Sequence, residues 1–303
     1  MNLRIGTRRS RLALVQAGEV AGRLAAIGVQ TELVPMATAG DRGAGSSGST
    51  AGMKGLFVAE IVQALQRGDV DLAVHSAKDL PSVDPPGVGV GAIPERADPL
   101  DVLVTRQPGA LEGGSVVGTS SLRRRAQLAR SRPELAVVEL RGNVDSRLAK
   151  LAAGEVDGLV LAAAGLGRLG IESAHVTPLS LDEMVPAPGQ GALAVQIRSD
   201  DRRVREVVEA LEDASSRRAF EAERAVVARL GGGCALPLGA YARAGDGGVW
   251  LVVVVARSDG TDLIRAEAEA PDPEEAGRVA SETLVARGAA EILASAVRGP
   301  RGE

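Results

Sequence analysis

Aromatic side chains are almost missing from this sequence, which has two Phe, one Tyr and one Trp among 303 residues. Proteins that bind single-stranded nucleic acids stack the bases on such side chains. The formal net charge of −4 likewise gives the chain no general attraction for polyanions. We therefore expect no nucleic-acid partner, and any site that binds anions must be a local one.

Long apolar runs and metal-ligand clusters are also lacking. The longest apolar run, 249–256, is far too short to cross a bilayer. A secretion signal needs an uninterrupted apolar core, but arginines interrupt residues 1–14. Two distant histidines, which we interpret as structural, and one cysteine make no recognisable metal-ligand spacing. We expect no membrane partner, no metal and a cytoplasmic location.

The only cysteine, Cys234, lies in the segment GGGCALPLG after a strongly helical stretch. A lone thiol cannot form an internal disulfide, and the glycines before it leave room for a bulky group beside the sulfur. This setting suits a nucleophile or a point of covalent attachment. The alternative is a small apolar residue that follows a glycine helix stop.

The expected elements alternate in the manner of an α/β protein. A strand at 3–7, a helix at 10–26 and a strand at 29–36 open the chain as a βαβ unit. The glycine-rich stretch 39–55 is long for a connection inside a compact domain, which indicates a mobile lid or a disordered linker. We favour the lid, because Lys54 leads directly into the next helix.

An internal repeat suggests two lobes of similar build. In GDVDLAV at 68–74 and in GEVDGLVL at 154–161, a helix ends on glycine, an acidic turn follows and a buried strand begins. Alternating strands between 238 and 268, with a helix on either side, then predict a small α+β domain. We expect three domains, with these boundaries: lobe 1 at 1–96 and 192–212, lobe 2 at 97–191, and the third domain at 213–303.

Basic residues follow several of the expected strands. The carboxyl ends of strands in an open α/β sheet are where ligands bind, and cations in a first helical turn oppose the helix dipole unless an anion lies there. Guanidinium groups suit carboxylates as well as phosphates. The alternative is that these arginines are simply solvated. The strand-end residues that predict a polyanion site are Arg8, Arg123, Arg124, Arg141, Arg168, and Arg147 on the helix that Asn143 opens.

One acid stands at an equivalent position. Asp79 follows the strand 72–74 in HSAKDLP and should face the same crevice. A carboxylate held among arginines stays ionised and can stabilise a cation or move protons. A turn-forming aspartate, or a partner for Lys78, is the alternative.

Seven segments together resemble one family across essentially the whole chain. In order they are TRRS at 7–10, GMKGLF at 52–57, HSAKD at 75–79, GTSSLRR at 118–124, LRGN at 140–143, GQGA at 189–192 and GGC at 232–234. Their order and approximate spacing are similar to those of hydroxymethylbilane synthases, also called porphobilinogen deaminases. The resemblance implies two periplasmic-binding-protein-like lobes and a third small α+β domain that carries the cofactor cysteine.

The resemblance also implies the chemistry. A dipyrromethane cofactor would be attached to Cys234 through a thioether, and four porphobilinogen molecules would be deaminated and condensed head to tail before water releases linear hydroxymethylbilane. Asp79 would assist catalysis, and a monomer is expected. The residues implied to bind cofactor and substrate are Arg8, Ser10, Lys54, Lys78, Ser121, Arg123, Arg124, Arg141, Arg147, Arg168 and Gln190.

The sequence departs from this family at two places. Arg11 stands where proline is frequent, and the stretch before Gly52 lacks a further lysine, which leaves Lys54 as the main cation there.

Two other classes of protein remain as alternatives. A non-catalytic anion-binding protein would share the lobes, but it explains neither the third domain nor Cys234. A nucleic-acid binder would use the basic run 123–125, but the acidic net charge of the chain argues against this function.

Overall fold

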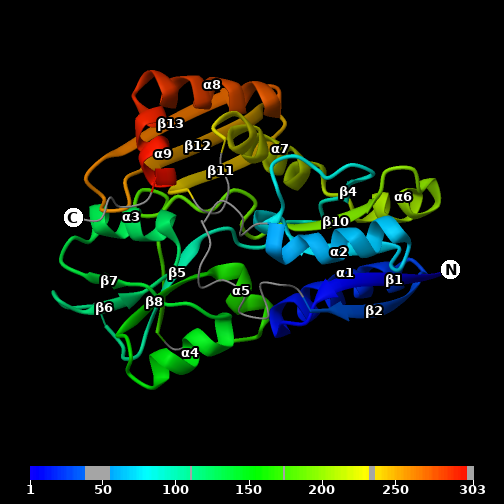
Figure 1. Ribbon diagram of the computed structural model, residues 1–303, viewed down its shortest axis with the longest axis horizontal. Coiled ribbons are helices and arrows are strands. Elements are labelled where there is room, and N and C mark those ends of the chain that lie inside the picture. Colours follow the sequence, from blue (N-terminus) through cyan, green and yellow to red (C-terminus); the bar gives the residue numbers. More distant parts are fainter. Residues whose placement is uncertain (38–54, 110, 173–174, 232–235, 299–303) are drawn as a thin grey trace.

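The computed structural model of the chain describes residues 1–37, 55–109, 111–172, 175–231 and 236–298. In these parts the strands form three sheets, and a five-stranded sheet lies at the centre of each of two lobes (Figure 1). A three-stranded sheet with its helices lies above the junction of the lobes. None of the helices described is long and apolar enough to span a bilayer.

The first lobe is built on a sheet with the strand order β2-β1-β3-β10-β4. Strand β1 runs parallel to β2 and β3, whereas β10 is antiparallel to both of its neighbours. Alternate side chains of each strand point to opposite faces of this sheet. Both faces are apolar, and each packs against different helices. The strands are β1 (Asn2–Arg8), β2 (Gln30–Met36), β3 (Leu72–Ser76), β4 (Val88–Ala92) and β10 (Leu193–Arg198).

Helices α1 (Arg11–Ala26) and α2 (Gly55–Arg67) cover these two faces. Leu24 of α1 packs in a cluster with Leu3 and Leu72 of the sheet, together with residues of α6 (Arg202–Val208). Residues of α2 form a second cluster on the other face. This double covering leaves the carboxyl ends of β1 and β3 as the open edge of the lobe that can hold a ligand.

The second lobe repeats this design with the order β7-β6-β8-β5-β9. Here β6 is parallel to β7 and β8, and β5 is the antiparallel strand. The elements of this lobe are β5 (Asp101–Thr105), β6 (Val116–Gly118), α3 (Leu122–Ser131), β7 (Ala136–Val138), α4 (Val144–Ala152), β8 (Gly158–Ala162), α5 (Ala163–Arg168) and β9 (Val176–Pro178).

The internal repeat has a structural counterpart in each lobe. Gly68 and Gly154 both have φ +77°, and both precede the acidic turn that enters a central strand. The carboxylate of Asp71 accepts a hydrogen bond of 2.8 Å from the backbone N–H of Arg4. That of Asp157 accepts one of 2.9 Å from the N–H of Val116. The expected pair of similarly built α/β lobes is therefore confirmed.

Two connections, 93–100 and 179–192, join the lobes. After the second connection the chain enters β10, which lies in the first sheet between β3 and β4. This strand lies within the range 192–212 that we expect to belong to lobe 1. Gly191 of the second connection lies at the candidate site described below.

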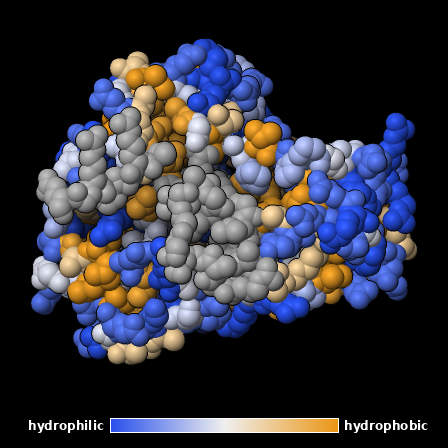
Figure 2. All heavy atoms as spheres, viewed as in Figure 1, coloured by the Kyte–Doolittle hydropathy of each residue, from blue (hydrophilic) through white to orange (hydrophobic). Residues whose placement is uncertain are grey.

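The third unit is an antiparallel sheet covered by helices on one face. Its strands are β11 (Leu238–Gly245), β12 (Gly248–Ala256) and β13 (Leu263–Ala270), and its helices are α7 (Ala214–Arg229), α8 (Pro273–Ala286) and α9 (Ala289–Arg298). Val253 of β12 packs toward the helices, whereas Val252 and Val254 pack against Val185 of the second connection. The outer surface of α8 is largely hydrophilic (Figure 2).

The structure contains single elements that the sequence analysis did not predict. Sequence reasoning identified neither β4 nor β9, which are short strands at the sheet edges. The helix expected after the last strand is two helices separated at Gly288, whose φ of +95° cannot continue a helix. The lid expected at 39–55 lies largely outside the described residues, and the expected domain boundaries stay predictions.

Candidate active site

A cavity of about 150 Å³ lies between the two lobes, far more space than one water molecule occupies. The first lobe lines it with residues that follow β1 and β3, and the second lobe with residues of α3, α4 and α5. Among the described residues, five cations and one acid line the cavity: Arg8, Lys78, Arg124, Arg147, Arg168 and Asp79. This excess of positive charge suits an anionic ligand.

Arg8 and Ser10 lie where β1 passes into α1. Ser10 is the N-cap of α1, and its Oγ accepts a hydrogen bond of 3.3 Å from the N–H of Ala13. Thr7 Oγ1 donates a bond of 3.1 Å to the carbonyl oxygen of Ala13. These bonds fix the turn that presents Arg8 and Ser10 to the cavity.

Lys78 and Asp79 belong to a 3-10 turn, Ala77–Asp79, that directly follows β3. The turn is tied to the second connection, because Ala77 N–H donates to the carbonyl oxygen of Ala192 at 3.0 Å. Burial lowers the pKa of Lys78, and the charge of Arg124 lowers it further, whereas Asp79 and Asp101 act in the opposite direction. A bound carboxylate would favour the charged form of this lysine.

Arg123 and Arg124 share one fully buried carboxylate, that of Asp101 on β5. Arg123 Nη1 lies 2.6 Å from Asp101 Oδ2, and Arg124 Nη2 lies 2.7 Å from Oδ1. Burial opposes ionisation, but the two guanidinium charges outweigh it and hold the pKa of Asp101 well below its usual range. Within the chain itself, Asp101 therefore supplies the charge compensation that we had expected from bound anions at the start of α3.

Arg147 and Arg168 each keep a buried nitrogen that has no protein acceptor in the described structure. Arg147 Nη2 donates to Ser120 Oγ at 3.1 Å, and its Nε is unpaired. Burial lowers the pKa of Arg147 to about 10, with a further contribution from the charge of Arg124. Arg168 Nε donates to Glu19 Oε2 at 2.8 Å, and its Nη2 is unpaired. Buried donors of this kind call for an acceptor that the described chain does not supply, and a bound ligand or an ordered water can provide one.

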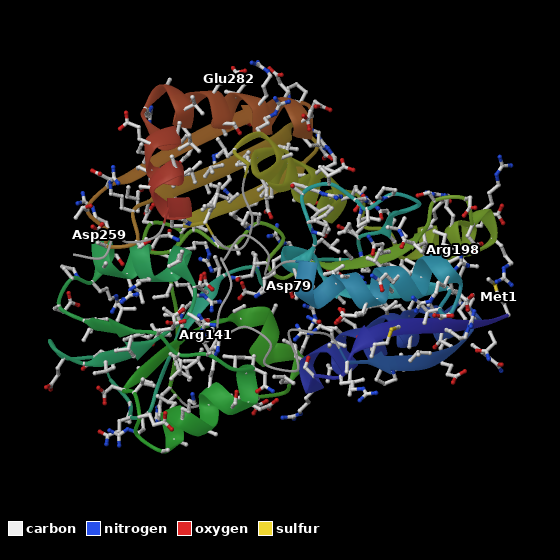
Figure 3. The ribbon with its side chains drawn as sticks, in the orientation of Figure 1. Met1, Asp79, Arg141, Arg198, Asp259 and Glu282 are labelled. Atoms are coloured by element: carbon white, nitrogen blue, oxygen red, sulfur yellow. The ribbon has the colours of Figure 1, made fainter. Side chains whose placement is uncertain are left out.

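The structure brings together seven of the expected site residues, all of which line the cavity: Arg8, Ser10, Lys78, Asp79, Arg124, Arg147 and Arg168. Figure 3 places Asp79 and Arg141 near the middle of the molecule, Asp79 from the first lobe and Arg141 from the second.

Four expected residues do not line this cavity in the part of the chain described. Ser121 caps α3, Arg123 donates to the carbonyl oxygen of Val185 at 2.8 Å, and Arg141 pairs with Glu139 at 2.6 Å. Gln190 is 1% exposed and donates to Asp101 at 3.0 Å. Lys54 and Cys234 lie outside the described residues. The binding roles of all these residues stay predictions.

Sequence reasoning missed three residues of the site. Asp101 could have been noticed as a charge that directly precedes an apolar strand, but Glu19 lies on a helix among other polar residues and gives no such signal. His75, which we interpreted as structural, lines the cavity. Burial lowers the pKa of His75 to about 4, and the charge of Arg8 lowers it further. His75 is therefore neutral near pH 7.

The residues present fit the acidic side chains of a dipyrromethane, because Arg147 and Arg168, each with an unpaired guanidinium nitrogen, line one cavity together with Lys78 and Asp79. A pyrrole oligomer with acetate and propionate groups needs several such donors at once. The attachment residue, Cys234, is outside the described range. No group of three or more potential metal ligands occurs in the portion of the chain that was described.

Comparison with known proteins gives two family matches. Residues 3–206 match the model "Porphobilinogen deaminase, dipyromethane cofactor binding domain", and residues 218–286 match "Porphobilinogen deaminase, C-terminal domain". A curated relative, "Porphobilinogen deaminase" from Syntrophotalea carbinolica, is 48% identical over 300 residues, which cover 97% of this chain and 95% of that protein.

Similar solved structures are more distant in sequence. The periplasmic VFT2 domain of BvgS from Bordetella pertussis is 14% identical, with 69% of this chain and 86% of that chain covered and a TM-score of 0.41. The methionine binding protein MetQ is 13% identical, with 71% and 92% covered and a TM-score of 0.45. Both TM-scores lie below 0.5, so these similarities bear no argument about this chain.

Proposed function

The chain belongs to the porphobilinogen deaminase family, and from that membership we propose how its residues carry out the reaction of a hydroxymethylbilane synthase. The family is one of transferases in tetrapyrrole and haem biosynthesis. Its substrate is porphobilinogen, and its product is linear hydroxymethylbilane. The family model that covers the two lobes is that of a dipyrromethane-binding domain.

The observation that carries the assignment of residues is the pair of unpaired guanidinium nitrogens in the cavity, Arg147 Nε and Arg168 Nη2. Each nitrogen is buried and lacks a protein acceptor. Arg147 lies on α4 and Arg168 on α5, so two different helices of the second lobe supply these donors. We assign them to carboxylates of the bound pyrroles, together with Arg8 and Arg124 in the same cavity. Dispersed guanidiniums allow successive carboxylates to be bound as the chain of pyrroles grows.

Asp79 is the proposed catalytic residue. It is the only acid among the described lining residues, and Lys78 next to it keeps the site positive. Positive charge develops on porphobilinogen as ammonia leaves, and a carboxylate held at that place stabilises this charge. The same carboxylate can accept the proton that a pyrrole carbon loses after the new bond has formed.

The cofactor dipyrromethane, when bound, supplies the nucleophilic pyrrole carbon to which porphobilinogen is added. We propose that Cys234 is its attachment residue, and that Lys54, Ser121, Arg123, Arg141 and Gln190 contribute to binding as the resemblance of their motifs implies. The division into lobe 1 at 1–96 and 192–212, lobe 2 at 97–191 and the third domain at 213–303 accords with the three sheets. A cytoplasmic location and a monomeric state belong to the same proposal.

The intact mass of the purified protein tests this function. A covalent excess of two pyrrole units that disappears in Cys234→Ser, together with production of hydroxymethylbilane from porphobilinogen, is the expected result. Cys234→Ala serves as a second variant, because it removes the thiol without adding a hydroxyl. A well-folded protein with the bare polypeptide mass and no product would contradict the assignment and favour a binding protein.

A further inference from the structure

Two ion pairs cross from α1 of the first lobe to the second lobe. One joins Glu19 to Arg168 at 2.8 Å, and the other joins Arg11 to Asp145 at 3.0 Å. Their burial differs greatly, because the side chain of Arg168 is 8% exposed and that of Arg11 is 60% exposed. Exposed pairs contribute little to stability or geometry, whereas a partly buried pair holds its members in place. Of these two pairs, the one that includes Glu19 also includes a residue that lines the cavity.

The contact with Glu19 fixes one edge of the Arg168 guanidinium. Glu19 Oε2 accepts the hydrogen of Nε, while Nη2 is buried and has no protein acceptor in the structure as described. A guanidinium is planar, so a bond at Nε sets the direction of the remaining donors. Those donors are the ones that a substrate carboxylate could bind, and a side chain already held loses less conformational entropy on binding.

Glu19 does not neutralise this part of the site. Its other oxygen, Oε1, accepts a hydrogen bond of 3.0 Å from Arg23 Nη2, one turn along α1. One carboxylate is therefore shared between two guanidiniums, and a net positive charge remains beside the cavity. Since Glu19 uses Nε and leaves Nη2 unpaired, Glu19 and a substrate carboxylate can bind Arg168 at the same time.

We propose that Glu19 is a positioning residue for substrate binding, which holds Arg168 from the opposite lobe so that its unpaired Nη2 faces the carboxylate of an incoming porphobilinogen. This proposal rests on the assignment of Arg168 to substrate binding. Glu19 lies on α1 and Arg168 on α5, so the contact exists only in an arrangement of the lobes like this one. The binding geometry of Arg168 thus depends on how the lobes are placed.

Equilibrium binding of porphobilinogen tests the proposal. The titration would use the holoenzyme, with its cofactor verified by intact mass, in an Asp79→Asn background that slows turnover. Because a hydrogen bond to a charged group changes an affinity by about tenfold or more, Glu19→Ala is expected to raise Kd about tenfold. Glu19→Gln keeps an oxygen acceptor without the charge and should lie between Glu19→Ala and the parent protein.

Two further variants separate positioning from a general effect on lobe closure. Asp145→Asn removes the other interlobe pair and is expected to leave Kd within about twofold, as for an exposed ion pair. Arg168→Gln should weaken binding, and adding Glu19→Ala to it should have no further effect, because Glu19 acts through Arg168. Steady-state kinetics with Asp79 intact should show an increase in KM with kcat nearly unchanged.

The outcomes that overturn the proposal are distinct. An unchanged Kd in Glu19→Ala would remove any role in binding, and a lower Kd would show that Glu19 competes with the substrate carboxylate. Equal effects of Asp145→Asn and Glu19→Ala would indicate lobe closure instead. If the parent protein carries two pyrroles and makes hydroxymethylbilane, these results overturn the role of Glu19 alone and leave the proposed function standing.

Discussion

At the scale of single residues, the site is defined by cations placed where their charge is costly. Burial lowers the pKa of Arg147 and of Lys78, and in both cases the charge of Arg124 contributes. The protein holds these groups together without a ligand by giving Arg124 the buried carboxylate of Asp101. Arginine keeps its proton in such surroundings, whereas lysine loses it more readily.

This difference predicts the result of Arg147→Lys. An unperturbed lysine has a pKa of about 10.4. The burial that lowers the pKa of Arg147 would also lower the pKa of a lysine at this position, toward neutral pH. A lysine is charged below its pKa, so binding of porphobilinogen should be retained near pH 7 and lost as the pH rises. The wild-type Arg147, with a pKa of about 10, should keep its charge across this range. The dependence of KM on pH between 7 and 9 measures the effect.

Arg125→Lys is the matched control. Arg125 follows Arg124 on the same helix, but it is exposed and donates a hydrogen bond to the carbonyl oxygen of Val137 at 3.3 Å. Its KM should follow the wild-type profile. A flat profile for Arg147→Lys would show that this position does not bind a carboxylate.

Asp79→Asn tests the catalytic acid. The amide has nearly the same size as the carboxylate but cannot carry its charge or accept a proton, so kcat should fall about a hundredfold or more. The measurement is the rate of hydroxymethylbilane formation by protein whose mass shows the bound cofactor. Asp69→Asn, at an exposed turn where Asp69 pairs with Arg67, should keep full activity. Near-normal turnover of Asp79→Asn would exclude Asp79 from the mechanism.

At the scale of elements, the site depends on two turns packed against each other. Gly189 in the second connection has φ +75°, and a Cβ there would lie 2.9 Å from the backbone nitrogen of Lys78. Its N–H also donates to the buried carboxylate of Glu223 on α7, at 2.5 Å. A single glycine therefore sets the distance between the connection and the turn that carries Asp79.

Gly189→Ala should accordingly displace the turn Ala77–Asp79 as well as strain the backbone. We expect both a loss of stability and a reduction in kcat, measured by thermal unfolding and by product formation. Gly28→Ala is the control for strain alone, because Gly28 has φ +80° with no atom within 4 Å of the added Cβ. That substitution should cost about 1 kcal/mol and leave kcat unchanged. Equal activities of the two variants would contradict the role of the close contact.

At the scale of the whole molecule, Asp101 links parts of the chain that are far apart in sequence. Its carboxylate binds Arg123 and Arg124 of α3 and also accepts from Gln190 Nε2, at 3.0 Å, in the connection that returns to the first lobe. Gln190 in turn accepts at its backbone oxygen from Arg96 of the other connection, at 2.8 Å. One buried network therefore joins the second lobe to both connections.

Removing this carboxylate should destabilise the protein strongly. Asp101→Asn leaves two buried guanidiniums without their counter-charge, and loss of one member of such a group costs about 3–5 kcal/mol. Urea unfolding at pH 7 measures the change. Glu282→Gln, which breaks an exposed pair with Arg278 on the outer face of α8, should leave the midpoint unchanged. A small effect of Asp101→Asn would mean that solvent reaches the network.

The pH dependence of this difference follows from the lowered pKa of Asp101. A carboxyl group whose pKa is lower in the folded state stabilises that state above its unfolded pKa of about 3.9, and this contribution is lost as the pH falls below that value. The difference in unfolding free energy between the wild type and Asp101→Asn should therefore be full at pH 7 and smaller at pH 3. A difference that stays constant over this range would contradict the assigned charge.

The sequence predicted local features well where the responsible interactions are local. The caps Ser10 and Asn143 each bind an N–H three residues further along the chain, so their position in the sequence is sufficient to identify them. The strands β4 and β9 were missed, because short edge strands form through pairing with β10 and β5 and have little pattern of their own.

The sequence by itself determined the α/β class, the repeated lobe, the family resemblance and the strand ends at which cations gather, because periodicity, turn residues and motif order act over short stretches of chain. Only the tertiary structure decided which cations face the cavity. Arg123 and Arg124 are adjacent in sequence, yet Arg124 lines the cavity and Arg123 turns toward Val185. Such differences arise from buried partners such as Asp101 and Glu19, which folding brings from distant segments and which no local pattern specifies.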